Sequence, residues 1–179
     1  MRIMKTNFTY YMLASLVIMV LVAPLSTKAE HVLGLGLRHH ALHSVYEELP
    51  YDDGDVSYGF SYEFHEENAY WQLALDYAPE LTGTNKVDHA LTPQLNLMFK
   101  DSFWRAGLGI MSTYMVYEDD SDNEDDWTDI YYQFLAGISI PLGSLSIDIM
   151  GGYVFEDWGE LDEFDFDDMD VIGWLKYAF

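Results

Sequence analysis

The fold of this chain is constrained most by an alternation of apolar and polar residues that recurs in eight segments. In residues 56–64, for example, every second residue is aromatic or aliphatic, and the residues between them are serine, glycine or glutamate. Successive side chains of a β-strand point to opposite faces of a sheet, so this period gives each strand one apolar face. The sequence therefore predicts an all-β protein with strands at residues 32–43, 56–64, 69–77, 89–99, 103–117, 128–140, 145–155 and 169–179.

The connections between these strands are alternately long and short. An even number of strands brings both ends of the chain to the side of the three short turns and leaves the four long loops on the other side. Transmembrane barrels of the bacterial outer membrane have this arrangement, with short periplasmic turns and longer extracellular loops. The predicted fold is an eight-stranded antiparallel up-and-down transmembrane β-barrel formed by residues 30–179.

The alternating faces would also suit a soluble eight-stranded carrier that is apolar inside and polar outside. Composition favours the opposite arrangement. The apolar faces are large and rich in aromatic residues, whereas the lumen of eight strands is only wide enough to be filled by side chains. The polar faces contain small residues such as Gly34, Gly36 and Gly109, which can pack around a narrow axis. We therefore expect the apolar faces to meet lipid.

The last eleven residues, MDVIGWLKYAF, end on Phe179, with Tyr177 two positions before it. This ending resembles the closing strand of bacterial outer-membrane β-barrels, whose assembly machinery reads a terminal phenylalanine preceded by such an aromatic residue. Together with the strand pattern, it makes the chain similar to small barrels of the OmpX, OmpA-domain and OmpW kind. The resemblance implies a monomer in the outer membrane of a Gram-negative bacterium. It also implies that Tyr177 and Phe179 form the assembly signal, and that the partners are membrane lipid, lipopolysaccharide and the barrel-assembly machinery.

Residues 1–29 have the features of a secretory signal peptide. Arg2 and Lys5 precede an apolar stretch from Tyr10 to Leu25, and small residues lead to an expected cleavage after Ala29. The alternative is an N-terminal membrane anchor, which needs about 20 apolar residues. The stretch is shorter than this and is interrupted by Ser15 and Pro24, so we expect a signal peptide.

The charge of the remaining chain is strongly negative. Three of the eight basic residues lie in the first 29 residues, whereas all 31 acidic residues lie in residues 30–179, so that part has a formal charge of 5 − 31 = −26. Nucleic acid is excluded as a partner, because phosphate contacts need clustered lysine and arginine. Cysteine is absent, so the chain has no disulfide framework.

The polar faces of the expected strands carry charges of both signs, which the register turns into the lumen. Buried charges are tolerated when they are paired. We expect a salt-bridged plug, and the alternative is a gated or proton-conducting lumen. The predicted members of this charge network are Arg38, Glu63, Asp76, Arg105, Asp148 and Lys176.

Acidic residues crowd three of the four long loops. Clusters of carboxylate oxygens suit Ca²⁺, so a weak calcium site is one hypothesis, and no other cofactor is expected. The segment that starts at Asp120 lacks the glycine that an EF-hand loop needs at its sixth position. A solvated acidic rim is therefore the alternative. The candidate calcium ligands are Asp120, Asp122, Glu124, Asp165 and Asp167.

Four residues near the outer end of the first expected strand, His39, His40, His43 and Ser44, suggest chemistry. Some outer-membrane barrels modify lipid with a histidine, a serine and an acid, but no third residue stands here at a suitable spacing. Residues four apart along a strand are also roughly 13 Å apart, too far to share a metal ion. The sequence therefore predicts no catalytic site.

The leading functional hypothesis is a small integral outer-membrane barrel with a structural or surface-interaction role and without enzymatic activity. The first alternative is a narrow, porin-like channel or a conduit for small apolar molecules, as the resemblance to the OmpW kind implies. The second alternative is an enzyme that acts on envelope lipid.

Overall fold

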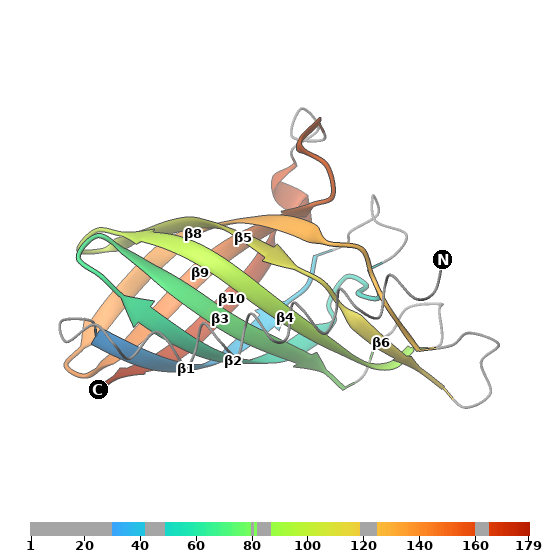
Figure 1. Ribbon diagram of the computed structural model, residues 1–179, viewed down its shortest axis with the longest axis horizontal. Coiled ribbons are helices and arrows are strands. Elements are labelled where there is room, and N and C mark those ends of the chain that lie inside the picture. Colours follow the sequence, from blue (N-terminus) through green and yellow to red (C-terminus); the bar gives the residue numbers. More distant parts are fainter. Residues whose placement is uncertain (1–29, 42–48, 80, 82–86, 119–124, 160–164) are drawn as a thin grey trace, which may run out of the picture.

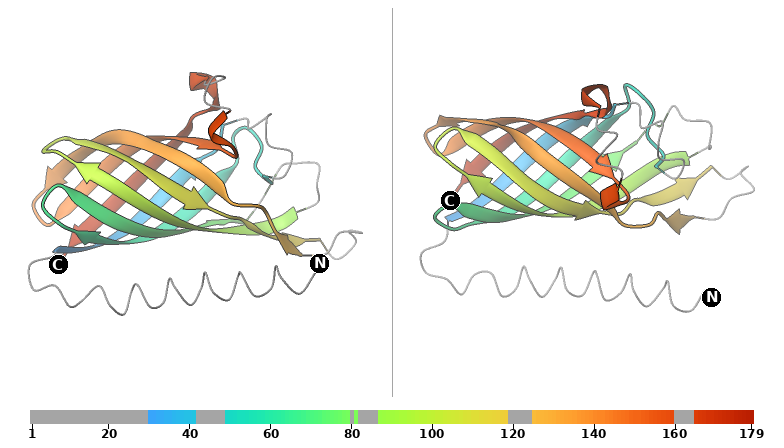
Figure 2. Two further views of the ribbon diagram at one scale, coloured as in Figure 1. Left: turned by 45° about the horizontal axis from the view of Figure 1, so that its top comes forward. Right: turned by 90° about the horizontal axis from the view of Figure 1, so that it is seen from above.

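The chain forms a closed β-barrel with tilted strands, seen from the side in Figures 1 and 2. The computed structural model describes residues 30–41, 49–79, 81, 87–118, 125–159 and 165–179. The predicted signal peptide lies outside these residues. The strands are β1 (Glu30–His39), β2 (Val56–His65), β3 (Ala69–Ala78), β4 (Val87–Lys100), β5 (Trp104–Met111), β6 (Tyr114–Tyr117), β7 (Asp126–Trp127), β8 (Tyr131–Leu142), β9 (Leu145–Phe155) and β10 (Asp170–Ala178), and a short 3-10 helix, η3, covers Phe166–Asp168.

The barrel is closed by antiparallel pairing of its first and last strands, from Val32 opposite Ala178 to His39 opposite Val171. Every other strand pairs antiparallel with its neighbours along the chain. β5 and β6 follow one another along the same side of β4, and β7 leads into β8. The ten labelled strands therefore occupy eight strand positions around the barrel. The eight-stranded antiparallel barrel predicted from the sequence is confirmed.

Two expected strands are interrupted, and Pro93 provides the physical reason. In a hydrogen-bonded antiparallel pair, both residues exchange N–H···O bonds. Ser112 N donates to the carbonyl of Pro93 at 3.4 Å, but proline has no N–H to return the bond. The expected strand at 103–117 therefore breaks between β5 and β6. Hydroxyl and backbone bonds take over there: Thr113 N donates to Thr128 Oγ1 at 2.9 Å, and β8 begins only at Tyr131.

The first strand is also shorter than expected, because it ends at His39 and not at residue 43. His40 N donates to the carbonyl of Asp55, and Gly54 N donates to the carbonyl of His40. The chain beyond His39 is thus held by the segment that precedes β2, outside the regular ladder. This positions the His40 side chain at the mouth of the barrel.

The apolar faces of the strands point outward, as predicted. Leu35 is 65% exposed, and Phe60 and Leu175 are exposed by about half. The residues between them point inward and are buried, including charged and amide side chains. An apolar exterior around a polar interior is the arrangement expected of a barrel that lies in lipid.

The lumen is filled by side chains rather than open. One inward cluster consists of Tyr70, Ala74, Met98, Leu135, Met150, Ile172 and Trp174. Helices contribute little to the fold, and no helix in the described part of the chain is long and apolar enough to cross a membrane. The C-terminus and the short turns lie at one end of the barrel, and β6 extends beyond the other end (Figure 1).

Candidate functional site in the barrel lumen

The ammonium group of Lys176 in β10 bridges two buried carboxylates. Its Nζ lies 2.6 Å from Oε1 of Glu63 and 2.6 Å from Oδ2 of Asp148. Glu63 also accepts a hydrogen bond from Gln72 at 2.7 Å, and its Oε2 lies 2.7 Å from Nε2 of His65. These contacts join β2, β3, β9 and β10 across the lumen, because their polar faces all point to the barrel axis.

A second charged group surrounds Arg38 of β1. Its Nε donates to Oδ2 of Asp170 at 2.6 Å, and its Nη1 lies 3.8 Å from Oδ2 of Asp76. The same Nη1 donates to Oε1 of Gln133 at 3.3 Å. Sequence reasoning missed Asp170, although a signal was present: counting back in steps of two from Lys176 along the closing strand reaches this residue.

Four amide side chains connect these two charged groups. Asn96 donates to Gln72 at 2.8 Å, and Gln133 donates to both Asn96 and Gln94 at 2.8 Å. Gln94 in turn donates to Oδ2 of Asp76. Hydrogen bonds therefore run through the lumen from the group around Lys176 to the group around Arg38.

Arg105 lies apart from this network. It is only partly buried, and its Nη1 donates to the backbone carbonyls of Asp101 and Trp104 at the turn between β4 and β5. The structure thus brings together five of the six predicted charges and replaces Arg105 with Asp170.

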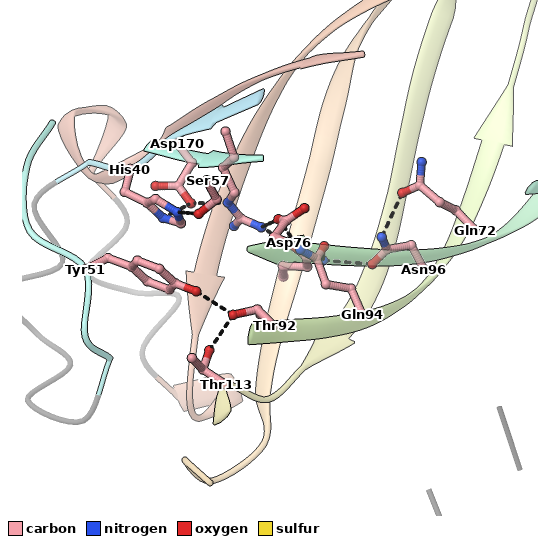
Figure 3. Close-up of polar contacts among 12 residues, drawn as sticks. His40, Tyr51, Ser57, Gln72, Asp76, Thr92, Gln94, Asn96, Thr113 and Asp170 are labelled. Carbon is pink, nitrogen blue, oxygen red and sulfur yellow. Dashed lines mark hydrogen bonds and ion pairs between the residues drawn. The ribbon is translucent and has the colours of Figure 1, made fainter. Parts of the chain in front are cut away.

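At the other end of the network, His40 and Ser57 meet next to Tyr51, which belongs to the connection between β1 and β2 (Figure 3). His40 Nε2 lies 2.5 Å from Oγ of Ser57, and His40 Nδ1 lies 3.6 Å from Oδ2 of Asp170. The ring of Tyr51 is stacked on the His40 ring, with centroids 3.7 Å apart and planes within 4°. The hydroxyl of Tyr51 is hydrogen-bonded to Thr92, which also contacts Thr113 at 2.9 Å.

The other residues of the expected histidine cluster do not join this group. His39 is exposed on the outer face of β1, whereas His43 and Ser44 lie outside the described residues. A serine, a histidine and an aspartate are in contact in the order of a hydrolase triad, with His40 between Ser57 and Asp170. However, their side chains are buried in this state, with exposed fractions of 2% or less.

The candidate calcium ligands are only partly described. Asp120, Asp122 and Glu124 lie outside the described residues. Asp165 caps η3, because its side chain accepts a hydrogen bond from the backbone of Asp167. In the described ranges, no three metal-ligating side chains gather into a possible site. The calcium site stays a prediction.

The two residues of the expected assembly signal lie on the outer face of the barrel. Tyr177 is half exposed and pairs with Leu33 of β1 and Leu145 of β9. Phe179 donates its backbone N–H to the carbonyl of His31 at 3.0 Å, and the two rings are stacked with centroids 6.0 Å apart. The chain end therefore completes the seam between the first and last strands.

Comparison with known proteins supports the fold rather than a particular activity. No family model and no curated protein sequence matches the chain. Among solved structures, Neisserial surface protein A matches with a TM-score of 0.53 at 12% identity, covering 84% of this chain and 99% of that protein. The Yersinia pestis outer-membrane protein Ail, determined in bilayer nanodiscs, matches with a TM-score of 0.46 at 11% identity, covering 85% and 100% of the two chains. With its closed strand order, its lipid-compatible exterior and its polar lumen, the chain is a small eight-stranded β-barrel of the kind found in Gram-negative outer membranes.

Proposed function

We propose that the protein is an integral outer-membrane barrel with a structural or surface-interaction role, and that its lumen does not conduct. The observation that carries this proposal is the filled cross-section of the lumen. Ion pairs centred on Lys176 and Arg38 are joined by four amide side chains. Trp174 adds a large buried ring to the interior, where it packs against Gly36 of β1 and Gly59 of β2. Ions would have to break several buried hydrogen bonds to pass, and each of these is costly to leave unmade.

A proton-conducting lumen is disfavoured by the chemistry of the connecting residues. A proton relay needs groups that both release and accept the transferred proton, such as imidazoles, carboxylates or water. The residues between Glu63 and Asp76 are amides, whose NH₂ groups only donate and whose oxygens only accept. These hydrogen bonds fix the geometry of the plug without providing a path for protons.

The surface-interaction role is supported by the exposed acidic residues at the extracellular end. Carboxylates that attract divalent cations or basic groups could bridge to lipopolysaccharide phosphates or to a basic partner surface. Their concentration at one end of the barrel leaves the lipid-facing belt uncharged. The exposed acidic residues in the described part of these connections are Asp53, Glu118, Asp125, Asp126, Asp129, Glu156, Asp157, Asp165 and Asp167.

Enzymatic activity is not part of the proposal, although His40 and Ser57 are in hydrogen-bonding contact. A serine nucleophile must reach its substrate, and Ser57 is fully buried with Tyr51 stacked over its histidine partner. An assay for hydrolysis of envelope phospholipid and lipopolysaccharide by the folded protein tests this. Product formation that is lost in Ser57→Ala would contradict the proposal.

Planar-bilayer recording tests the closed lumen. The mature barrel should give no steady ion steps, whereas Trp174→Gly combined with Gln133→Ala should give steps, because both side chains help to fill the lumen. Leu175→Gly, which removes a lipid-facing side chain next to Trp174, is the matched control and should remain silent. Steady steps from the unaltered protein would show that the lumen is a channel.

A further inference from the structure

The extracellular mouth of the barrel is occupied by a segment of the protein's own chain. Leu49, Pro50 and Tyr51 are buried, although they belong to the connection between β1 and β2 rather than to a strand. Leu49 and Tyr51 are 6% and 5% exposed, comparable to residues in the centre of the lumen. A connection that is buried to this degree has entered a cavity that the strands leave unfilled.

The wall of this cavity is apolar and built from the inner faces of several strands. Leu49 and Tyr51 belong to one buried cluster with Ala78 of β3, Ala90 of β4 and Met111 of β5. Both alanines are fully buried. Their small side chains leave room in this cluster for the side chains of Leu49 and Tyr51.

The polar contacts of Tyr51 are those that a bound phenol would make. Its ring lies flat on the His40 imidazole, with centroids 3.7 Å apart. Its hydroxyl is hydrogen-bonded to Thr92, which is in contact with Thr113. In Figure 3 the side chain reaches from its connection toward Thr92. Apolar walls with a few polar groups that fix orientation are the usual composition of a small-molecule site.

We propose that the mouth is a binding site for small hydroxylated aromatic molecules and that Tyr51 occupies it as an internal ligand. The external ligand enters from the extracellular side when residues 49–51 withdraw. Its ring then stacks on His40, and its hydroxyl bonds to Thr92. This inference goes beyond a structural or surface-interaction role and does not require conduction through the lumen below.

Occupation by Tyr51 sets the affinity for the external ligand. When the binding-competent form is only a fraction of the population, the apparent affinity falls by that fraction. Removing the Tyr51 side chain should therefore strengthen binding without any change in the walls of the site. Binding to such a variant should retain the preference for a hydroxyl group, because Thr92 remains in place.

The test uses 4-methylphenol and, as a matched probe without the hydroxyl, toluene. Calorimetry on the detergent-folded mature barrel should show that Tyr51→Gly binds 4-methylphenol at least ten times more tightly than the unaltered protein does. Tyr51→Gly should also prefer 4-methylphenol to toluene, and adding Thr92→Val should remove that preference. Tyr177→Gly, which deletes a tyrosine on the lipid-facing surface, is the control and should bind like the unaltered protein.

A second measurement on the unaltered protein covers the case in which Tyr51→Gly does not fold. Saturating 4-methylphenol should shift the methyl resonances of Ala78 and Ala90. The methyl resonance of Ala136, which faces lipid, should shift only as far as partitioning of 4-methylphenol into the detergent shifts it, without saturation. Equal binding of toluene and 4-methylphenol to Tyr51→Gly would reduce the site to an engineered apolar cavity and overturn the proposal. Shifts confined to Ala136, or no saturable shifts at all, would overturn it as well.

Discussion

The indole ring of Trp174 lies against the backbone of Gly36, so that a β-carbon added at Gly36 would be 2.5 Å from Cε3 of the ring. The ring extends from β10 across β1 toward Gly59 of β2, where a β-carbon would be 2.7 Å from Cη2. A contact below 3.0 Å forces one group to move, and a ring held between two strands has little room to do so. Glycine at these two positions is what allows the tryptophan ring to lie over the inner faces of β1 and β2.

Replacing Gly36 with alanine should therefore destabilise the barrel by about 1–3 kcal/mol, the usual cost of overpacking a filled interior. Gly173→Ala is the matched control, because a β-carbon there meets nothing within 4 Å. Urea unfolding in lipid vesicles measures both free energies of unfolding. Equal stability of the two variants would show that Trp174 is not confined by Gly36.

Period-two alternation was enough to predict which residues face lipid and which face the lumen. Leu35 and Gly36 illustrate the reason: adjacent residues of a strand must face opposite ways, so one correctly assigned residue fixes the rest. The same rule placed Arg38, Glu63, Asp76, Asp148 and Lys176 inside without knowledge of their partners. Strand pairing then determines which of these charges meet, because it brings inward side chains at the same height in the barrel together.

The sequence could not indicate contacts made by connections or by strand ends. Tyr51 stands in a polar connection with no periodic pattern, and only packing inside the mouth buries it. The contact between His40 and Ser57 depends on where β1 stops, which Gly54 and Asp55 determine through backbone hydrogen bonds. Such boundaries are the least certain part of any reading from local pattern, because tertiary contacts decide them.

Removing the charge of Lys176 should be strongly destabilising. Lys176→Met leaves the buried carboxylates of Glu63 and Asp148 without the ammonium group that lies 2.6 Å from each of them. Loss of one partner from a buried ion pair costs about 3–5 kcal/mol. Adding Glu63→Gln and Asp148→Asn should recover most of that loss in the same unfolding assay. A triple variant as unstable as Lys176→Met alone would mean that shape, and not charge, is what the lysine supplies.

A charged side chain at position 35, on the lipid-facing surface, should lower the stability of the barrel. This side chain lies near the middle of β1 and is 65% exposed. An arginine at the bilayer midplane of a barrel costs about 2–4 kcal/mol, whereas Leu35→Met, which keeps the size and polarity, should cost less than about 1.5 kcal/mol. Unfolding from lipid vesicles compares the two. If arginine is tolerated as well as methionine, the belt does not lie in hydrocarbon.

The C-terminal residue should be needed for efficient assembly. Deleting Phe179 removes its hydrogen bond to the carbonyl of His31 and the stacking between the two rings. We expect sharply lower levels of folded protein in the outer membrane, measured by heat-dependent mobility of membrane fractions. Phe179→Tyr retains the ring and the backbone bond and should assemble normally. Normal levels of the truncated protein would contradict a role for the chain end.

The packing of Tyr51 in the mouth should loosen at alkaline pH. Burial raises the pKa of Tyr51 to about 12, and the nearby charge of Asp76 acts in the same direction. An exposed tyrosine loses its proton near pH 10. Between about pH 10 and pH 12 the closed form thus holds a proton that the open form has released, so the stability of the closed form falls as the pH rises through this window. Below about pH 10 both forms are protonated, and this contribution stays constant.

The measurement is the difference between the unaltered protein and Tyr51→Phe, which keeps the ring and removes the titrating group. The difference in tyrosinate absorbance should show one group ionising near pH 12, later than an exposed tyrosine. The shifts of the Ala78 methyl should change over the same range in the unaltered protein, because that methyl belongs to the same cluster as the ring. In Tyr51→Phe the methyl should stay unchanged over this window. Ionisation of Tyr51 near pH 10 would mean that the phenol is not buried in the mouth and that the segment already leaves the mouth freely at neutral pH.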